Sequence, residues 1–419
     1  MPRRSDPTNH PIALRSGGRK RLHHPPSKNP SHGPNSHAHL PMHKQPCLPN
    51  EVAILDVISA SLAQALDDPN LAVKIQQIKA LLYEKRFLEV FETESWLDIY
   101  AARWVPSRAL AFREIFDSIG LLERSEEVAE FTKGKGKENA ESTAGTAVAG
   151  TAQSAESPRS AQKVICIGGG AGSELVALCA VVTQQLGSTN DQQHEESLHS
   201  ESETEETKKA EPETTPATES SSSVIPPLDI HLLDIGPYGE LINSFQDTCL
   251  SVLPGLSSDA TNAIFHQIDI LAPACTPLFE NLLTRSTTQP PIITLLFTMT
   301  ELFIQSRPRT IAFLRMLSRF APRGTLFLVV DSANEEASAV TVGKEGRSWS
   351  LGMVMDGILC TPPPAATTGS EEPAPKAKAL WRKMESEDSK WYRLREGLQD
   401  HYPIKMENTR YWLRLYRRN

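Results

Sequence analysis

The residues best placed to do chemistry form a glycine-rich stretch between an apolar run and a series of helix formers. Val164–Ile167 is short and apolar, Gly168, Gly170 and Gly172 follow at alternate positions, and Glu174 comes next. Many nucleotide-type cofactor sites begin with such a strand, turn and helix, because a ligand can approach backbone that carries no Cβ. An ordinary strand-to-helix turn would show the same residue types.

The spacing of these glycines separates two classes of cofactor. A dinucleotide site of the form GxGxxG would place its last small residue at position 173, where this chain has Ser173, and Glu174 follows in the first helical turn. A pyrophosphate would meet that carboxylate, whereas S-adenosylmethionine (SAM) carries no phosphate and tolerates an acid there. We therefore predict methyl transfer rather than hydride transfer, with Gly168, Gly170, Gly172 and Glu174 around SAM.

Two acids stand near the ends of later apolar runs. Asp234 lies near the end of Leu228–Ile235, and Asp269 lies near the end of Ala263–Leu271. In a sheet of this kind we expect Asp234 to accept hydrogen bonds from the ribose hydroxyls of the cofactor, and Asp269, with Ile270, to contact its adenine. Acids are also frequent in the turns that end strands, which leaves a purely structural alternative.

Two further carboxylates follow buried-type strands. Ile292–Phe297 leads into Thr298 and Glu301, and Thr325–Val330 leads into Asp331. Ligands of open α/β sheets bind outside the carboxyl ends of the strands. We therefore expect Thr298 beside the cofactor, and Glu301 and Asp331 near the reacting methyl group, where either could accept a proton or hold the substrate.

The elements that must position these residues alternate between strand and helix. Helices are predicted from Ser173 to about Leu186, over Ile242–Leu253 and over Arg309–Phe320. Five strand-and-helix units of this kind predict an α/β fold with a mainly parallel, doubly wound, Rossmann-like sheet. Tyr411–Tyr416 alternates bulky residues and is predicted to be a final strand, which either contacts RNA or is an edge strand protected by charge.

An N-terminal helical domain is predicted over residues 51–131, where apolar residues recur at helical spacing. Within it, Pro106 is expected to end one helix and Ser107 to cap the next. Aromatic side chains beside arginines can stack bases and bind phosphates. Four residues therefore become candidate substrate contacts: Tyr100, Arg103, Trp104 and Arg108. Alternatively the aromatic stripe is helix core and the arginines pair with acids such as Glu114.

The remaining segments are too polar to form a core and are predicted to be disordered or linkers. They are the basic tail at residues 1–50, the linker at 132–162, an acidic insertion at 187–227 and a Pro-rich loop at 361–377, the last two within a cofactor domain spanning 163–419. The acidic insertion holds ten acids and two lysines, so its net charge of −8 equals that of the whole chain. The basic tail could attract RNA or address the protein to the nucleus.

Composition excludes several classes of protein. The six cysteines have no CxxC or metal-ligand spacing, which predicts a reduced intracellular protein without a bound metal. No apolar run reaches the length of a membrane span, and the N-terminus lacks an apolar signal core. We therefore expect a soluble protein that does not enter a membrane.

Three segments together resemble a known family, the fungal large-subunit ribosomal RNA (rRNA) uridine N3-methyltransferases that act on 25S rRNA. They are ICIGGGAGSELVAL at 165–178, YAARWVPSRAL at 100–110 and FTMTELF at 297–303. The likeness runs from about Val52 to the C-terminus, interrupted by the low-complexity insertions. It implies a class I methyltransferase fold, SAM as methyl donor, and action on pre-60S particles in the nucleolus, with the cytoplasm also open. Many methyltransferases carry an acid two residues before the first glycine, where this chain has Cys166.

The resemblance also implies a chemistry. N3 of uridine lies on the pairing edge and bears a weakly acidic proton, so the base must be unpaired or flipped out and the proton removed. Glu301 and Asp331 are then the candidates for accepting it, and Arg103, Trp104 and Arg108 for clamping the nucleotide. Two other classes stay open: an assembly factor that keeps the fold without catalysis, and a methyltransferase of a small molecule or protein.

Overall fold

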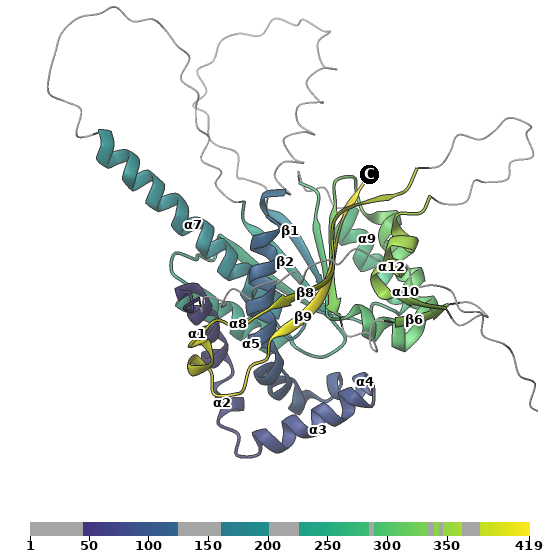
Figure 1. Cartoon of the computed structure of the whole chain (residues 1–419), viewed down its shortest axis with the longest axis horizontal. Helices are drawn as coiled ribbons and strands as arrows, with labels where there is room; N and C mark the ends of the chain where they lie inside the picture. Colours follow the sequence, from purple (N-terminus) through teal and green to yellow (C-terminus); the bar gives the residue numbers. More distant parts are fainter. Residues whose placement is uncertain are drawn as a thin grey trace, which may run out of the picture. The chain divides into compact units, whose positions relative to one another are not determined.

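The computed structural model describes residues 45–124, 161–200, 226–284, 289–333, 339–342, 347–362 and 378–419. Within these ranges a seven-stranded sheet has the order β3-β2-β1-β4-β5-β9-β8 (Figure 1). Its strands are β1 (Gln162–Ile167), β2 (Leu228–Asp234), β3 (Thr261–Gln267), β4 (Ile292–Leu296), β5 (Leu326–Ser332), β8 (Trp381–Tyr392) and β9 (Thr409–Arg418). The first five are parallel, and β9 is antiparallel to both of its neighbours. The predicted Rossmann-like sheet is confirmed.

Helices cover both faces of the sheet. They are α1 (Pro49–Ser61), α2 (Ala63–Leu66), α3 (Leu71–Tyr83), α4 (Phe87–Phe91), α5 (Glu94–Ser118), α7 (Ser173–Ser200), α8 (Gly239–Val252), α9 (Thr276–Thr284), α10 (Met299–Phe320) and α12 (Leu351–Leu359). Because side chains alternate along a strand, β1 feeds two cores: Val164 and Cys166 pack with α1, α5, α7 and α8, whereas Ile165 and Ile167 pack with α9, α10 and α12. Two 3₁₀ turns, Pro273–Cys275 and Leu398–His401, and a hairpin of β6 (Ala339–Val342) and β7 (Arg347–Ser350) complete the described elements.

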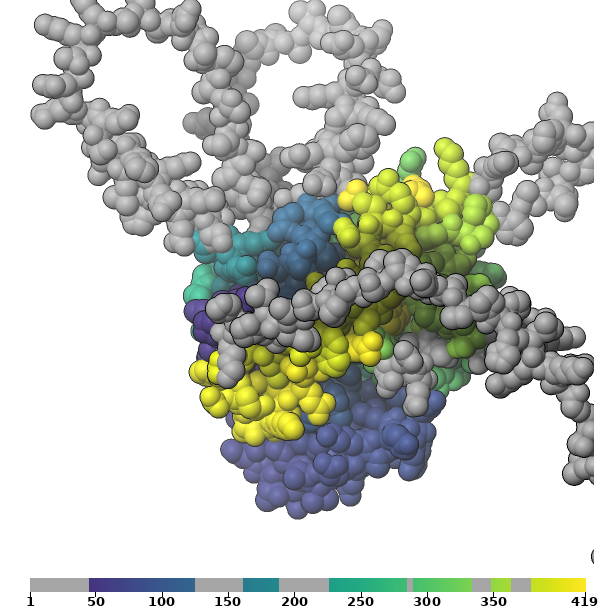
Figure 2. Space-filling view, in the orientation of Figure 1, coloured from purple at the N-terminus to yellow at the C-terminus, as the bar shows by residue number. Residues whose placement is uncertain are grey.

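The N-terminal helices share a core with the sheet. α1 packs on α8 and α5 packs on α7, and a single compact unit extends from Lys44 to Asn419. Figure 2 shows the C-terminal segment, coloured yellow, against the N-terminal helices, coloured purple to blue. Helices are therefore present in the region predicted to be helical, 51–131, and they pack in the core on one face of the sheet.

The prediction that Pro106 ends a helix is wrong, because α5 continues through it from Glu94 to Ser118. Proline has no N–H, so the carbonyl of Ala102, four residues earlier, loses its helical partner. The hydroxyl of Tyr402 donates a hydrogen bond to that carbonyl at 2.7 Å. Ser107 does not cap a helix; its Oγ accepts from the backbone N–H of Glu407 at 3.1 Å. The C-terminal segment thus supplies the partner that the proline removes.

Several element boundaries differ from those expected. The helix expected over Arg309–Phe320 begins at Met299 and is kinked at Ser306, where φ is −163° and ψ is 99°. α7 continues past Leu186 to Ser200, into the acidic segment; residues 201–225, like most of the basic tail, the linker and the Pro-rich loop, lie outside the described residues. Tyr411–Tyr416 lies inside the sheet, between β5 and the edge strand β8, and its aromatic side chains are buried.

Two further features of the described residues bear on the class of protein. None of the helices in these ranges is both long and apolar enough to cross a membrane. The same ranges contain no cluster of three or more His, Cys, Asp or Glu side chains arranged to hold a metal ion.

Candidate functional site

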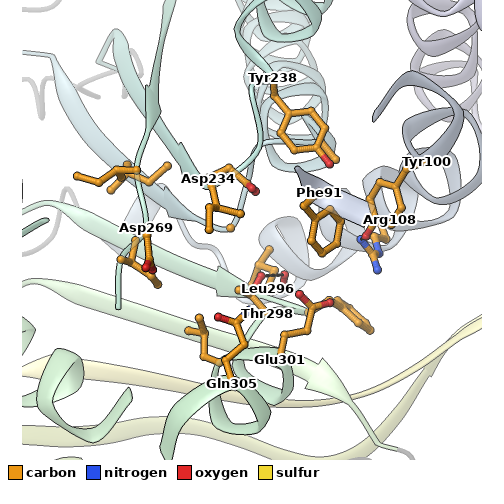
Figure 3. Close-up of a pocket in the computed structure, with 18 residues that line it drawn as sticks. Phe91, Tyr100, Arg108, Asp234, Tyr238, Asp269, Leu296, Thr298, Glu301 and Gln305 are labelled. Carbon is orange, nitrogen blue, oxygen red and sulfur yellow. Dashed lines mark hydrogen bonds between the residues drawn. The ribbon is translucent and has the colours of Figure 1, made fainter. Parts of the chain in front are cut away.

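A pocket lies at the carboxyl ends of the parallel strands, where the predicted candidates converge (Figure 3). Its wall comes from the segments after β1, β2, β3 and β4 and from α4 and α5. Eight of the predicted residues line it: Tyr100, Arg108, Gly168, Asp234, Asp269, Ile270, Thr298 and Glu301. Because strand ends far apart in the sequence meet at one edge of a parallel sheet, the topology alone brings them together.

The three glycines of the loop have different roles. Gly168 lines the pocket with φ of +76°, and a Cβ there would lie 2.2 Å from Oγ1 of Thr298. Gly170 and Gly172 face inward: a Cβ at Gly170 would lie 2.5 Å from Cβ of Asp234, and one at Gly172 would lie 2.5 Å from the Phe245 ring. All three glycines therefore let the loop pack closely on its neighbours, and Gly168 alone of the three also lines the pocket.

Asp234 holds the loop and faces the pocket. Its carboxylate accepts hydrogen bonds from the backbone N–H groups of Gly170 and Gly236 at 3.0 and 3.1 Å. Burial raises its pKa to about 6, against the lowering effect of those hydrogen bonds. A carboxylate has about four acceptor positions, so Asp234 keeps capacity for two hydroxyl groups of a ribose.

The side of the pocket that follows β2 and β3 is apolar with one carboxylate. Ile235, Ile268 and Ile270 line it together with Asp269, whose Oδ1 accepts from the backbone N–H of Leu271 at 2.8 Å. An apolar slot with a few placed polar groups is typical of a small-ligand site. The loop backbone at Gly168, the Asp234 carboxylate and this slot together fit the nucleoside and the amino-acid part of SAM.

Glu301 presents a carboxylate to the pocket from the first turn of α10 (Figure 3). Among the described residues it has no hydrogen-bond partner. Burial raises its pKa to about 8, with a further rise from Asp331 and Asp234 and an opposing effect from the Arg108 cation. An unengaged carboxylate that titrates near neutral pH can act as a general base.

Arg108 faces Glu301 from α5 and is held between two aromatic rings. Its guanidinium carbon lies 5.5 Å from the centre of the Tyr100 ring and 5.6 Å from that of Phe297, and its Nη1 donates to the Tyr100 hydroxyl at 2.6 Å. Phe297 has a φ of +56°, which is strained for a residue with a Cβ. The strained strand end therefore places an aromatic face against a fixed cation in the pocket.

Asp331 lies behind the pocket and does not line it. It is 2% exposed, and its carboxylate accepts from the backbone N–H groups of Thr300 and Ser332 at 2.7 and 2.6 Å. Burial raises its pKa, although these hydrogen bonds act in the opposite direction. Since Thr300 precedes Glu301, Asp331 fixes the helical turn that carries Glu301.

Glu174 also lies outside the pocket, beneath the glycine loop. Its Oε1 accepts from the Thr294 hydroxyl of β4 at 2.5 Å, and burial raises its pKa to about 8. A Cβ added at Gly169 would lie 2.7 Å from Glu174 Oε2 and 2.9 Å from Cβ of Cys166. Glu174 thus brings a carboxylate close to Cys166, the position where many methyltransferases carry an acid.

Arg103 and Trp104 do not line the pocket. Arg103 is 5% exposed and forms an ion pair with Glu407, rather than with an acid of its own region such as Glu114. Trp104 stacks on Tyr100 with ring centres 4.8 Å apart. Trp104 therefore supports Tyr100, and the Arg103 guanidinium lies over the Trp104 ring at 5.6 Å.

The pocket includes residues that the sequence interpretation missed. Tyr238 lines it, and among the described residues its buried hydroxyl has no hydrogen-bond partner. Its position four residues after Asp234, at the same sheet edge, was a usable signal. Phe91 of α4 also lines the pocket and packs edge-on against Tyr100 at 5.1 Å. No spacing in the sequence connects Phe91 with the glycine loop.

Comparisons with known proteins agree with this geometry. Residues 58–417 match the model of a family described as "Putative SAM-dependent methyltransferase". A relative from Saccharomyces cerevisiae, the 25S rRNA (uridine(2843)-N(3))-methyltransferase, is 26% identical over 399 residues, which cover 92% of this chain and 90% of the relative.

Similar solved structures are also methyltransferases. One is a SAM-dependent methyltransferase from Methanosarcina mazei, with 9% identity, 62% of this chain and 93% of that chain covered, and a TM-score of 0.31. Another is the plantazolicin methyltransferase BpumL in complex with SAH, with 12% identity, 88% and 98% covered, and a TM-score of 0.29.

Proposed function

The chain belongs to this family of SAM-dependent methyltransferases, and from that premise we propose that it methylates N3 of a uridine in large-subunit (25S) rRNA. The substrate rests on the yeast relative, which is similar along nearly the whole chain. The observation that carries the proposed chemistry is the Glu301 carboxylate, which has no partner among the described residues and faces Arg108 across the pocket.

Glu301 takes the N3 proton in this proposal. SAM bound in the pocket supplies a methyl group on a positively charged sulfur. Glu301 accepts the N3 proton as N3 takes that methyl group, and the sulfur would keep the electron pair of the bond that breaks. A base with a pKa of about 8 accepts a weakly acidic proton near neutral pH more readily than an ordinary glutamate does.

Arg108 stabilises the deprotonated base. Removal of the N3 proton spreads negative charge over N3 and the two carbonyl oxygens of uracil, and a guanidinium held in place by Tyr100 and Phe297 needs little rearrangement to bind it. Asp331 positions Glu301 through the backbone of Thr300.

The biological partner that follows from this proposal is the pre-60S particle, in the nucleolus. A base paired in the mature ribosome would hide N3, so the enzyme needs rRNA that is not fully assembled. The test is methyl transfer from labelled SAM to large-subunit rRNA from cells that lack this gene, followed by nucleoside analysis.

Label in N3-methyluridine is the expected result. If the protein binds SAM but labels neither purified rRNA nor pre-60S particles, the substrate is a different one. If it does not bind SAM in calorimetry, the chain is an assembly factor that has kept only the fold.

A further inference from the structure

An exposed tryptophan stands near the carboxyl end of the edge strand β8. Trp391 is 48% exposed, whereas Trp381 on the same strand and Trp412 on β9 are buried. The guanidinium carbons of Arg393 and Arg410 lie 5.6 and 5.9 Å from the centre of its ring. Arg410 is directly across from Trp391 on β9, and Arg393 follows the last residue of β8, so both guanidinium groups lie beside the exposed indole.

The cationic side chains around Trp391 are available to bind an anionic ligand. Within the described residues Lys390, Arg393 and Arg410 form no ion pair with a carboxylate, and all three are exposed. Elsewhere on the same two strands, Arg414 pairs with Asp388 and Lys383 pairs with Asp356. Arg410 is oriented by its Nε, which donates to the Ser389 hydroxyl at 2.9 Å. The surface therefore complements an anion.

This surface lies at the same edge of the sheet as the pocket. β8 is antiparallel to β9 and β9 is antiparallel to β5, so β8 ends at the carboxyl edge of the parallel strands. The carbonyl of Arg410 accepts from the backbone N–H of Ala333, the residue that follows β5, at 3.2 Å. Trp412, two residues along from Arg410, packs in the core under α9, α10 and α12, so Arg410 faces the side of the sheet that carries Glu301.

We propose that Trp391, Arg393 and Arg410 form a stacking platform for unpaired RNA next to the target uridine. A base stacks on the exposed indole and the arginines bind the adjacent phosphates, which is how sequence-tolerant sites hold single-stranded RNA. Extraction of one base from a helix leaves flanking nucleotides that must be held, and a platform at the pocket edge holds them. The inference rests on the proposed rRNA substrate and names the surface that binds it.

The test measures binding of the full-length protein to a fluorescently labelled, single-stranded RNA containing the target region of 25S rRNA. Trp391→Ala is expected to weaken binding about tenfold, the size of one lost base-stacking contact. Arg410→Glu is expected to weaken binding by a similar factor and to reduce its dependence on salt.

Two matched variants and one independent measurement serve as controls. Trp349→Ala removes a tryptophan that is 45% exposed on the separate β6–β7 hairpin, and Arg382→Glu makes the same charge change at the opposite end of β8. Both are expected to bind RNA within about twofold of the wild type. Affinity for SAM, measured by calorimetry, should be equal in all variants and thereby shows that they are folded.

Equal RNA binding by Trp391→Ala and the wild type, in a protein that methylates rRNA, would overturn the platform and leave the proposed function standing. Equal losses in Trp391→Ala and Trp349→Ala would also overturn it, because the effect would not be local. If the wild type binds SAM but neither binds nor methylates the RNA, the proposed function fails first and the platform with it.

Discussion

Two regions of the molecule combine aromatic side chains with arginines, and they use them in opposite ways. In α5, Arg108 faces inward between Tyr100 and Phe297 and lines the pocket. At the end of β8, Trp391 faces outward between Arg393 and Arg410. A half-buried cation beside a carboxylate can act on charge that develops in a reaction, whereas an exposed indole with unpaired cations can only bind.

Each region also holds an arginine with a structural role. Arg103 of α5 pairs with Glu407, and Arg414 of β9 pairs with Asp388. Arg103 and Arg108 are five residues apart, so they point about 140° apart around the helix. Arg103 and Arg108 therefore have different roles because their side chains leave the helix in different directions, although both are arginines in the same stretch of sequence.

The largest expected effect is a loss of turnover when Glu301, the carboxylate opposite Arg108 in the pocket, is replaced. Glu301→Gln should lower kcat about 10³-fold because it removes the proton acceptor while keeping shape. Turnover of the wild type should rise with pH and level off above about 8, where Glu301 is deprotonated. Affinity for SAM serves as the control. Unchanged turnover in Glu301→Gln would remove Glu301 from the role of the base.

The second-largest expected effect is a loss of kcat/KM that distinguishes the two arginines of α5. Arg108→Lys should lower kcat/KM by about 10²-fold, because an ammonium cannot reproduce the planar group held between two rings. Arg103→Lys should stay within about threefold of the wild type, since Arg103 is outside the pocket. Initial rates over a range of RNA concentrations provide both values. Equal losses in the two variants would remove the distinction between these arginines.

A third prediction concerns the hydrogen bond between α5 and the C-terminal segment that follows β8. Tyr402→Phe leaves the buried carbonyl of Ala102 without a donor and should lower the free energy of unfolding by about 1–3 kcal/mol. In a Pro106→Ala background the same change should cost less, because the new N–H of residue 106 can donate to that carbonyl. Urea unfolding of the wild type, the two single variants and the double variant measures the coupling between the two substitutions. Identical losses in both backgrounds would mean that the hydroxyl does not compensate for the proline.

The smallest expected effect is on the pH dependence of stability, and it shows that a carboxyl group with a raised pKa need not be catalytic. Glu174 has the same pKa of about 8 as Glu301 but lies beneath the loop. The folded state retains its proton between about pH 4.5 and 8 while the unfolded state loses it, so the free energy of unfolding falls as pH rises through this range. The slope is at most about 1.4 kcal/mol per pH unit.

Glu174→Gln should therefore flatten the pH dependence of stability while turnover stays within about fivefold of the wild type. Urea unfolding between pH 5 and 9 measures the slope, and the difference between variant and wild type removes the shared contributions of Glu301 and Asp234. Parallel profiles for the two proteins would show that Glu174 stays charged in the folded state.

Local patterns were enough to find eight of the residues that line the pocket. The glycine loop, Asp234, Asp269 and Glu301 each stand where an apolar run ends, and an ordered series of such ends implies a shared edge of a parallel sheet. Patterns near a strand end could not tell Glu301 from Asp331. That distinction depends on whether backbone N–H groups already occupy the carboxylate, as Thr300 and Ser332 occupy Asp331.

Contacts between distant segments were beyond local reasoning. The sequence shows that Pro106 lacks an N–H but not that Tyr402 replaces it, because the partner lies about 300 residues away along the chain. In the same way, the alternation in Tyr411–Tyr416 predicted a strand, but only the strand order shows that β9 lies inside the sheet and β8 at its edge.

The sequence by itself determined the α/β class, the SAM-type loop and the order of acids along the sheet, because these depend on periodicity and on residues close together in the chain. The tertiary structure decided which side chains face the pocket, which hold its walls and which reach solvent. Those outcomes depend on direction and packing between distant elements: Arg108 rather than Arg103 meets Glu301, and Trp391 rather than Trp412 is exposed.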